Sequence, residues 1–168
     1  GEQPGVPAGL YHYVSRDHLL ERRWTPDDAD RAEVAALLGG GLLVGLTSIH
    51  WRESWKYGER AFRYCQHDTG HAIAALNLSA AVCGWKTVVL SKPGDDQICQ
   101  LLGLGSLDNP EAEHPDCLLA VVPQGDFFTE PSLARNAIEA IAAGKWQGNS
   151  NVLSTSHHPW PMIADVAR

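Results

Sequence analysis

The segment from about Trp55 to Cys83 constrains the fold most, because it is the longest stretch of the sequence that fits a single helix. Small and apolar residues recur along it at helical spacing, namely Ala61, Tyr64, Cys65, Ala72, Ala75, Leu76, Leu78, Ser79 and Val82. Such a face is typical of a helix that packs into a core and lets another backbone approach closely. Gly84 is its natural C-terminal stop, since glycine readily takes the left-handed conformation that ends helices. We therefore expect one long, core-facing helix that ends at Gly84.

Apolar runs and turn signals on either side of this segment predict further strands and helices. Strands are expected at Leu42–Ile49, Thr87–Leu90 and Cys117–Val122, with a hairpin formed by Gly9–Val14 and His18–Trp24. Helices are expected at about Pro26–Leu38, from Pro93 to Leu102 and at Glu130–Ala143. The run Leu42–Ile49 is almost continuously apolar, which is typical of a strand in the centre of a sheet. Hairpin and helical connections together predict an α+β fold rather than a regular β-α-β repeat.

Length and charge limit the classes of protein that this sequence fits. The 168 residues suffice for one domain with a real core. The formal net charge is −7 and the four lysines are scattered, which argues against binding of nucleic acid by phosphate neutralisation. No apolar run reaches the roughly 18 residues that a membrane span needs. Residues 1–5 lack the basic and apolar regions of a signal peptide.

The cysteines indicate a reducing compartment. Cys65, Cys83, Cys99 and Cys117 lie among apolar neighbours and form no CxxC motif. We therefore expect buried free thiols and a cytoplasmic protein.

The character of the sequence changes after Val122, where irregular segments rich in glycine, proline and asparagine become common. We expect residues 1–125 to form the folded domain. Residues 126–168 are expected to form a helix and then an irregular arm or linker. Trp146 and Trp160 are the aromatic residues through which we expect this arm to pack.

Basic and aromatic side chains are densest between Trp51 and His71. In a continuous helix, Lys56, Arg60 and Arg63 would lie along one side. One interpretation is a solvated charged face. The other is a site for a phosphate or carboxylate, with Lys56 or Tyr57 as a proton-transfer group. A partly buried lysine beside Arg60 would have a lowered pKa, which suits a base near neutral pH.

Two histidines four residues apart, His67 and His71, resemble the HExxH zinc signature. Asp68 is shorter than the glutamate of that signature, and His114, His157 and His158 are remote in sequence. We therefore expect no metal, and a zinc-dependent hydrolase is kept as an alternative. Gly70, inside the predicted helix, is expected to allow the close approach of a backbone or a ligand, because glycine costs a helix about 1 kcal/mol relative to alanine.

Several segments carry a family resemblance. GLYHYVSRDHLLERR resembles the hairpin of SagB-type dehydrogenases, the branch of the nitroreductase-like FMN flavoproteins that oxidises azolines in thiazole/oxazole-modified peptides. WKYGERAFRYCQHDTGHAIAALNLSAAVCGW is similar to their central segment, and DDQICQLLGL and DCLLAVVPQG are similar to the segments after it in the family. The tail GKWQGNSNVLSTSHHPWPMI is similar to a segment after such domains in longer members. The resemblance covers about residues 7–125.

The resemblance implies a nitroreductase-like α+β fold, with a mostly antiparallel sheet flanked by helices and FMN at the interface of an intertwined homodimer. Lys56 and Tyr57 match the Lys-Tyr pair implicated in azoline dehydrogenation. In that role Lys56 would act as the base while a hydride passes to the flavin, and Arg60 would organise the site.

Further positions match segments that contact the flavin in the family. The resemblance places Gly70 and His71 on a helix near the flavin or the dimer partner. It places Leu90, Ser91 and Lys92 where relatives have a glycine-rich loop that contacts the flavin.

Two family motifs have no counterpart in this sequence, namely an N-terminal Arg-Arg-Ser helix that holds the flavin phosphate and a loop under the flavin ring. We therefore expect the later part of such a domain, with the N-terminal part missing. A homodimer or a complementary chain would supply the flavin-phosphate site, and the substrate would be a small molecule or a peptide. The alternative is a flavin-free, nitroreductase-like module for binding or assembly, without catalysis.

Overall fold

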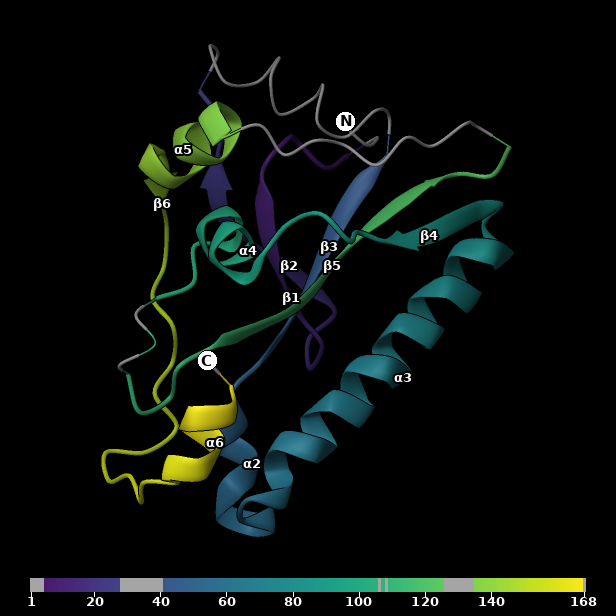
Figure 1. Ribbon diagram of the computed structural model, residues 1–168. Helices are drawn as coiled ribbons and strands as arrows, with labels where there is room; N and C mark the ends of the chain where they lie inside the picture. The colour runs from purple at the N-terminus through teal and green to yellow at the C-terminus, as the bar shows by residue number, and fades with distance from the viewer. Residues whose placement is uncertain (1–4, 28–40, 106, 108, 126–134, 168) are drawn as a thin grey trace.

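The computed structural model describes residues 5–27, 41–105, 107, 109–125 and 135–167 (Figure 1). Its helices and strands, in chain order, are β1 (Leu10–Val14), β2 (Leu19–Thr25), β3 (Leu42–Ser48), α2 (His50–Tyr57), α3 (Arg60–Val82), β4 (Trp85–Val89), α4 (Asp95–Leu102), β5 (His114–Pro123), α5 (Arg135–Ala143), β6 (Lys145–Trp146) and α6 (Pro161–Val166).

The larger part of the core is built on the antiparallel sheet β3-β5-β4. Strand β5 lies between its neighbours, pairing Leu119 with both Val44 of β3 and Val89 of β4. The run Leu118–Val122 is buried throughout, whereas β3 is mostly half-buried. The prediction that Leu42–Ile49 forms a central strand is therefore wrong for the described sheet. The more deeply buried apolar run of β5 occupies the centre instead.

The second sheet, β1-β2-β6, contains the predicted hairpin. Strands β1 and β2 pair antiparallel from Leu10 opposite Trp24 to Val14 opposite Leu19. Trp24 also pairs with Trp146 of β6, which attaches the C-terminal arm to this sheet. The predicted hairpin is confirmed.

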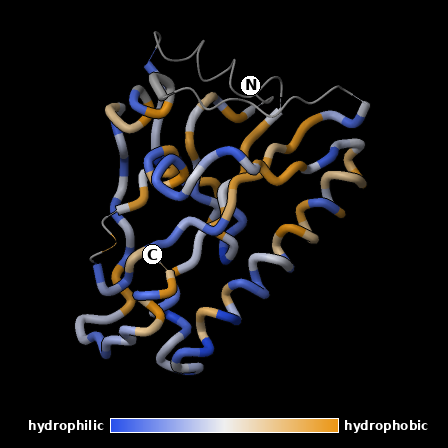
Figure 2. Tube along the Cα trace, viewed as in Figure 1, coloured by the Kyte–Doolittle hydropathy of each residue, from blue (hydrophilic) through white to orange (hydrophobic). Residues whose placement is uncertain are grey.

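The hydrophobic core lies where α4 and α5 meet the strands. It consists of Trp24, Leu90, Ile98, Leu101, Leu118, Ala120, Val122, Ile138 and Ile141. Figure 2 shows hydrophobic residues concentrated along the central strands. Gly45 of β3 allows α4 to approach, since a Cβ there would lie 2.6 Å from Cδ1 of Leu102. Helix α3 runs along the opposite side of the molecule from α4 and α5 (Figure 1).

The long helix predicted from Trp55 to Cys83 is wrong at its start and right at its end. Gly58 has φ +59°, which breaks the helix between α2 and α3. Gly84 has φ +73°, and its N–H donates to the carbonyl of Ala81, so the predicted stop is confirmed. The predicted core-facing character is wrong for much of α3, since Leu78 and Val82 are 69% and 89% exposed.

The C-terminal arm packs through the two predicted tryptophans. Trp146 packs against the hydrophobic core, and Trp160 lies beside Gly58. The arm also contains α6, which the sequence pattern did not predict. Of the predicted helix Glu130–Ala143, the structure describes α5 from Arg135. The predicted helix at about Pro26–Leu38 lies almost entirely outside the described residues.

The four cysteines are free, but they differ in burial. Cys65 is buried, Cys99 and Cys117 are half-buried, and Cys83 is exposed at the end of α3. The expectation that all four are buried is therefore wrong for Cys83. A cytoplasmic location stays a prediction. None of the helices in the described ranges has both the length and the apolar character to cross a membrane.

Candidate functional site

The Lys-Tyr pair lies at a sharp corner of the chain, where α2 ends and α3 begins. We call residues 56–60 the Gly58 corner. The N–H of Gly58 donates to the carbonyl of Ser54 at 2.7 Å, and the carbonyl of Gly58 accepts from Ala61 at 3.0 Å. The buried Ser54 hydroxyl donates to the carbonyl of Trp51 at 2.6 Å. These bonds fix the direction in which Lys56 and Tyr57 leave the last turn of α2.

Lys56 and Tyr57 form a pair on the surface. The Nζ of Lys56 lies 4.9 Å from the centroid of the Tyr57 ring. A hydrogen bond with Tyr57 and the charge interaction with it raise the pKa of Lys56 above its ordinary value. The expected lowering of this pKa is therefore wrong for the chain by itself, because Lys56 is exposed and not partly buried. The ring of Tyr57 meets that of Tyr64 edge-on, with centroids 4.7 Å apart.

Arg60 lies across the helix break from Lys56. The prediction that Lys56, Arg60 and Arg63 form a basic cluster required one continuous helix through all three residues. Because α2 ends at Tyr57 and α3 begins at Arg60, that spacing no longer places the three side chains along one side. Arg60 and Arg63 are both exposed at the start of α3.

Gly70 and His71 lie in the middle of α3, on the surface. A rise of about 1.5 Å per residue separates Gly70 from Arg60 by roughly 15 Å. A Cβ on Gly70 would meet nothing within 4 Å among the described residues. The close approach expected at Gly70 is therefore not made by this part of the chain, which leaves open space beside the helix.

The three residues after β4 divide between core and surface. Leu90 is 6% exposed, and its N–H donates to the carbonyl of Leu118 at 2.9 Å. Its side chain belongs to the hydrophobic core. Ser91 and Lys92 are exposed. The structure thus brings Lys56 and Tyr57 together, and it spreads the other predicted site residues along α3 and beyond β4.

The zinc alternative gains no support. His67 and His71 are exposed, and Nδ1 of His71 lies 3.7 Å from Oδ1 of Asp68. Within the described residues, no group of three or more His, Cys, Asp or Glu side chains is arranged to hold a metal ion. A third ligand, which sequence reasoning could not identify, is thus not provided by this part of the chain.

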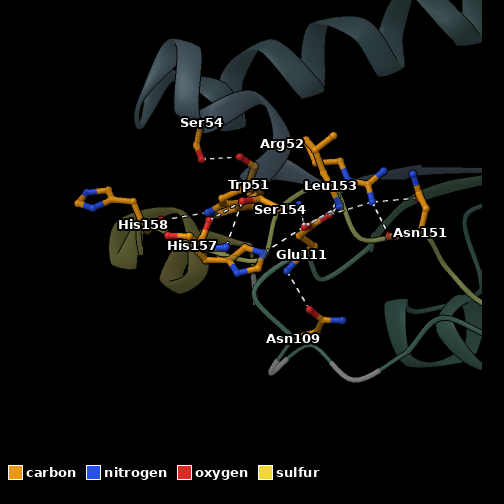
Figure 3. Close-up of polar contacts among 11 residues, drawn as sticks. Trp51, Arg52, Ser54, Asn109, Glu111, Asn151, Leu153, Ser154, His157 and His158 are labelled. Carbon is orange, nitrogen blue, oxygen red and sulfur yellow. Dashed lines mark hydrogen bonds and ion pairs between the residues drawn. The ribbon is translucent and has the colours of Figure 1, made fainter.

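A carboxylate that sequence reasoning missed joins α2 to the C-terminal arm (Figure 3). The side chain of Glu111, in the loop before β5, is 4% exposed. It accepts hydrogen bonds from the backbone N–H groups of Leu153 and Ser154 and from Nε of Arg52, and it pairs with Nε2 of His157. Burial alone would raise the pKa of Glu111, but these four partners together lower it to about 2.

A second missed residue, His50, lies at the start of α2 and is 3% exposed. Its ring centroid lies 5.0 Å from that of His114 and 5.2 Å from that of Phe62. Neither ring nitrogen of His50 has a hydrogen-bond partner in the described chain. Burial, followed by the charge of His114, lowers the pKa of His50, although Asp116 opposes the shift. His50 is thus a buried ring at the start of α2 whose charged form is disfavoured.

The fit of the chain to FMN is partial. Gly70 and His71 are exposed on α3, and a Cβ on Gly70 would meet nothing within 4 Å among the described residues. Arg60, Ser91 and Lys92 are exposed polar residues, whereas the side chain of Leu90 is buried. The described residues therefore suit one open side of a flavin site and not an enclosed cradle.

The chain is similar in sequence and in fold to known nitroreductases. Residues 8–121 match the Nitroreductase family. A protein of Methanocaldococcus jannaschii named "Putative nitroreductase" is 26% identical over 103 residues, which cover 58% of this chain and 52% of that protein. The crystal structure of a putative nitroreductase from Anabaena variabilis superposes with a TM-score of 0.58 at 25% identity, covering 74% of this chain and 26% of that one.

The chain therefore spans about half the length of the curated relative and about a quarter of the solved one. The fold expected from the sequence, with α+β content and antiparallel sheets flanked by helices, is confirmed. Because the family match covers more than half of its residues, this chain belongs to the nitroreductase family.

Proposed function

We propose that this chain is part of an FMN-dependent oxidoreductase of the SagB type, which oxidises azolines to azoles on a peptide. The observation that carries the proposal is the Lys56–Tyr57 pair, presented at the Gly58 corner within the segment that matches the family. Two hydrogens leave an azoline when it becomes an azole. Such a reaction needs a base for the proton and an acceptor for the hydride.

Lys56 is the proposed base, and it needs a change of surroundings to act as one. Its raised pKa keeps it protonated near neutral pH while it is exposed. Desolvation disfavours a charged ammonium, so covering this lysine with substrate or with a partner would lower its pKa. We therefore propose that Lys56 becomes an effective base only in the completed site. The ring of Tyr57 lies beside its Nζ, with the ring centroid 4.9 Å away.

Arg60, Gly70, His71, Ser91 and Lys92 are the residues proposed to lie against FMN. FMN, when bound, supplies the acceptor for the hydride. Gly70 supports this assignment because nothing in the described chain fills the space beside it. Leu90 is left out, because its side chain is packed in the core.

A second copy or a complementary chain is the proposed partner, and it would supply the flavin-phosphate site. Exposed apolar side chains near the end of α3 and on β4 support this, since Leu78, Val82 and Val89 are 69%, 89% and 48% exposed. A partner that covers such exposed apolar side chains removes them from water, which favours association.

The test uses the full-length parent protein. Purified protein is expected to show the visible absorbance of bound flavin. The Lys56→Ala variant is expected to keep that absorbance and to lose turnover by roughly a hundredfold or more, as general bases do when removed. Lys145→Ala is a matched control, because Lys145 is exposed on β6. Absence of flavin absorbance, or full turnover of Lys56→Ala, contradicts the proposal.

The second candidate is a flavin-free module for binding or assembly. Leu90 favours it, because a residue expected at the flavin is instead part of the core. This candidate predicts a colourless protein that still forms a defined dimer or hetero-complex. Tight binding of added FMN would exclude it.

A further inference from the structure

The C-terminal segment of residues 151–160, here called the strap, lies along α2 (Figure 3). Its first residue accepts twice from Nη2 of Arg52, through the Asn151 carbonyl at 2.8 Å and through its side-chain oxygen at 3.1 Å. Further along, the indole N–H of Trp51 donates to the carbonyl of His158 at 3.0 Å. The ring of Trp51 also packs against that of His157, with centroids 4.5 Å apart. The strap is thus bound to α2 at both of its ends.

The end of the strap reaches the Gly58 corner. A Cβ built on Gly58 would lie 3.4 Å from the Trp160 ring, so the indole covers the glycine at the helix break. The Trp160 ring itself packs edge-on against His158, with centroids 5.2 Å apart. A change in the position of the strap therefore changes what lies beside the residues that follow Lys56 and Tyr57.

Glu111 attaches the middle of the strap. Its Oε1 accepts from the N–H groups of Leu153 and Ser154 at 2.9 and 3.0 Å, and lies 3.0 Å from Nε2 of His157. Its Oε2 accepts from Arg52 at 2.9 Å. A carboxylate accepts only, and all four of these partners can donate. One buried side chain therefore joins the strap to α2.

We infer that Glu111 is a positioning residue, which holds the strap against α2 so that Trp160 fixes the Gly58 corner and the placement of Lys56. Its relevance to catalysis rests on the proposed function. The physical coupling between Glu111 and Lys56 does not, and it can be measured on the full chain without substrate or flavin.

The first experiment compares Glu111→Gln with the wild-type chain. The amide keeps the size of the side chain but turns an N–H₂ group toward groups that donate, so strap contacts are lost. Hydrogen exchange in residues 151–160 is expected to accelerate by about tenfold or more, which is the effect of losing charged hydrogen bonds. Glu113→Gln is the matched control, because Glu113 accepts from the hydroxyl of Thr47 instead.

The second measurement follows Lys56 directly. The rate at which an amine-acylating reagent modifies Lys56 is recorded against pH by peptide mass spectrometry. In Glu111→Gln the profile is expected to move to lower pH, because the contact between the Nζ of Lys56 and the Tyr57 ring, which favours the charged ammonium, depends on a fixed corner. A role confined to overall stability would leave this profile unchanged. An unchanged profile, or strap exchange equal to that of Glu113→Gln, overturns the inference.

A third variant keeps the inference testable if Glu111→Gln does not fold. Trp160→Ala leaves the contacts of Glu111 in place and removes the ring beside Gly58. It is expected to move the Lys56 profile in the same direction, and an unchanged profile overturns the inference. Turnover of Lys56→Ala is measured separately. If that variant stays active, the proposed function fails while the coupling of Glu111 to Lys56 can still stand.

Discussion

The indole of Trp24 packs directly against Gly144, and a Cβ on that glycine would lie 2.9 Å from Cε2 of the ring. Trp24 is 2% exposed and belongs to the hydrophobic core. We expect Gly144→Ala to lower the free energy of unfolding by about 1–3 kcal/mol, the usual cost of overpacking. Urea unfolding followed by tryptophan fluorescence measures the change.

Gly105→Ala is the control for this prediction, since a Cβ there meets nothing within 4 Å among the described residues. Its free energy of unfolding is expected to stay close to that of the wild-type chain. Equal stability of the Gly105 and Gly144 variants would show that the packing of Trp24 tolerates a methyl group.

Gly70→Ala is expected to have opposite effects on folding and on binding. Inside α3, alanine is favoured over glycine by about 1 kcal/mol, and nothing in the described chain obstructs the new methyl group. The chain alone should therefore become more stable in urea. Under the proposed function, the same methyl group fills the space left for flavin or for a partner, so flavin content or dimer formation should fall.

Ala74→Gly is a useful counterpart, because Ala74 is exposed on the same helix. It should lower stability by a similar amount. If Gly70→Ala binds flavin and dimerises as the parent does, the space beside Gly70 has no role in either.

Acid is expected to remove the contribution of Glu111 to stability. The folded-state pKa is lowered from 4.5 to about 2, so the stabilisation is present above pH 4.5 and is lost as the pH falls toward 2. Within this window the group contributes a slope of up to about 1.4 kcal/mol per pH unit. Urea unfolding at several pH values measures the difference in the free energy of unfolding between the wild-type chain and Glu111→Gln. This difference should become smaller as the pH falls. A constant difference would contradict the assignment.

His50 should add a decline in stability at milder acidity. Its pKa in the folded chain is lowered below 6.5, so the unfolded chain takes up the proton first. The free energy of unfolding therefore falls as the pH decreases below about 6.5. We expect His50→Leu to flatten this decline, while His67→Leu, at an exposed position, should retain it. If the free energy of unfolding of His50→Leu falls with pH as it does in the wild-type chain, groups other than His50 cause the decline.

The elements that could be predicted depend on neighbours in the sequence. The hairpin that ends at Trp24, the strand that includes Thr87 and the stop at Gly84 each follow from a local pattern of apolar residues and turn formers. The family motif likewise identified Lys56 and Tyr57 as a pair, because the two are adjacent.

The features that could not be predicted depend on contacts between distant segments. Gly58 lies among residues that favour helix, and the indole beside it comes from the C-terminal arm. Glu111 lies in a polar loop, and its donors come from α2 and from the strap. Leu90 follows a strand whether it contacts flavin or packs in the core, so the sequence around it does not distinguish the two. The packing of the fold shows that its side chain lies in the core. Burial and charge pairing between distant segments leave no recognisable pattern in the sequence around each residue.

The position of β5 has a consequence for how the chain folds during synthesis. In the described sheet, β3 and β4 pair only through β5, as when Leu42 meets Val121 and Trp85 meets Pro123. Both earlier strands therefore leave the ribosome without their hydrogen-bonding neighbour and present open edges until residues 114–123 emerge. Closure of this sheet is a late, long-range event, and the open edges of β3 and β4 can pair with other chains until β5 is complete.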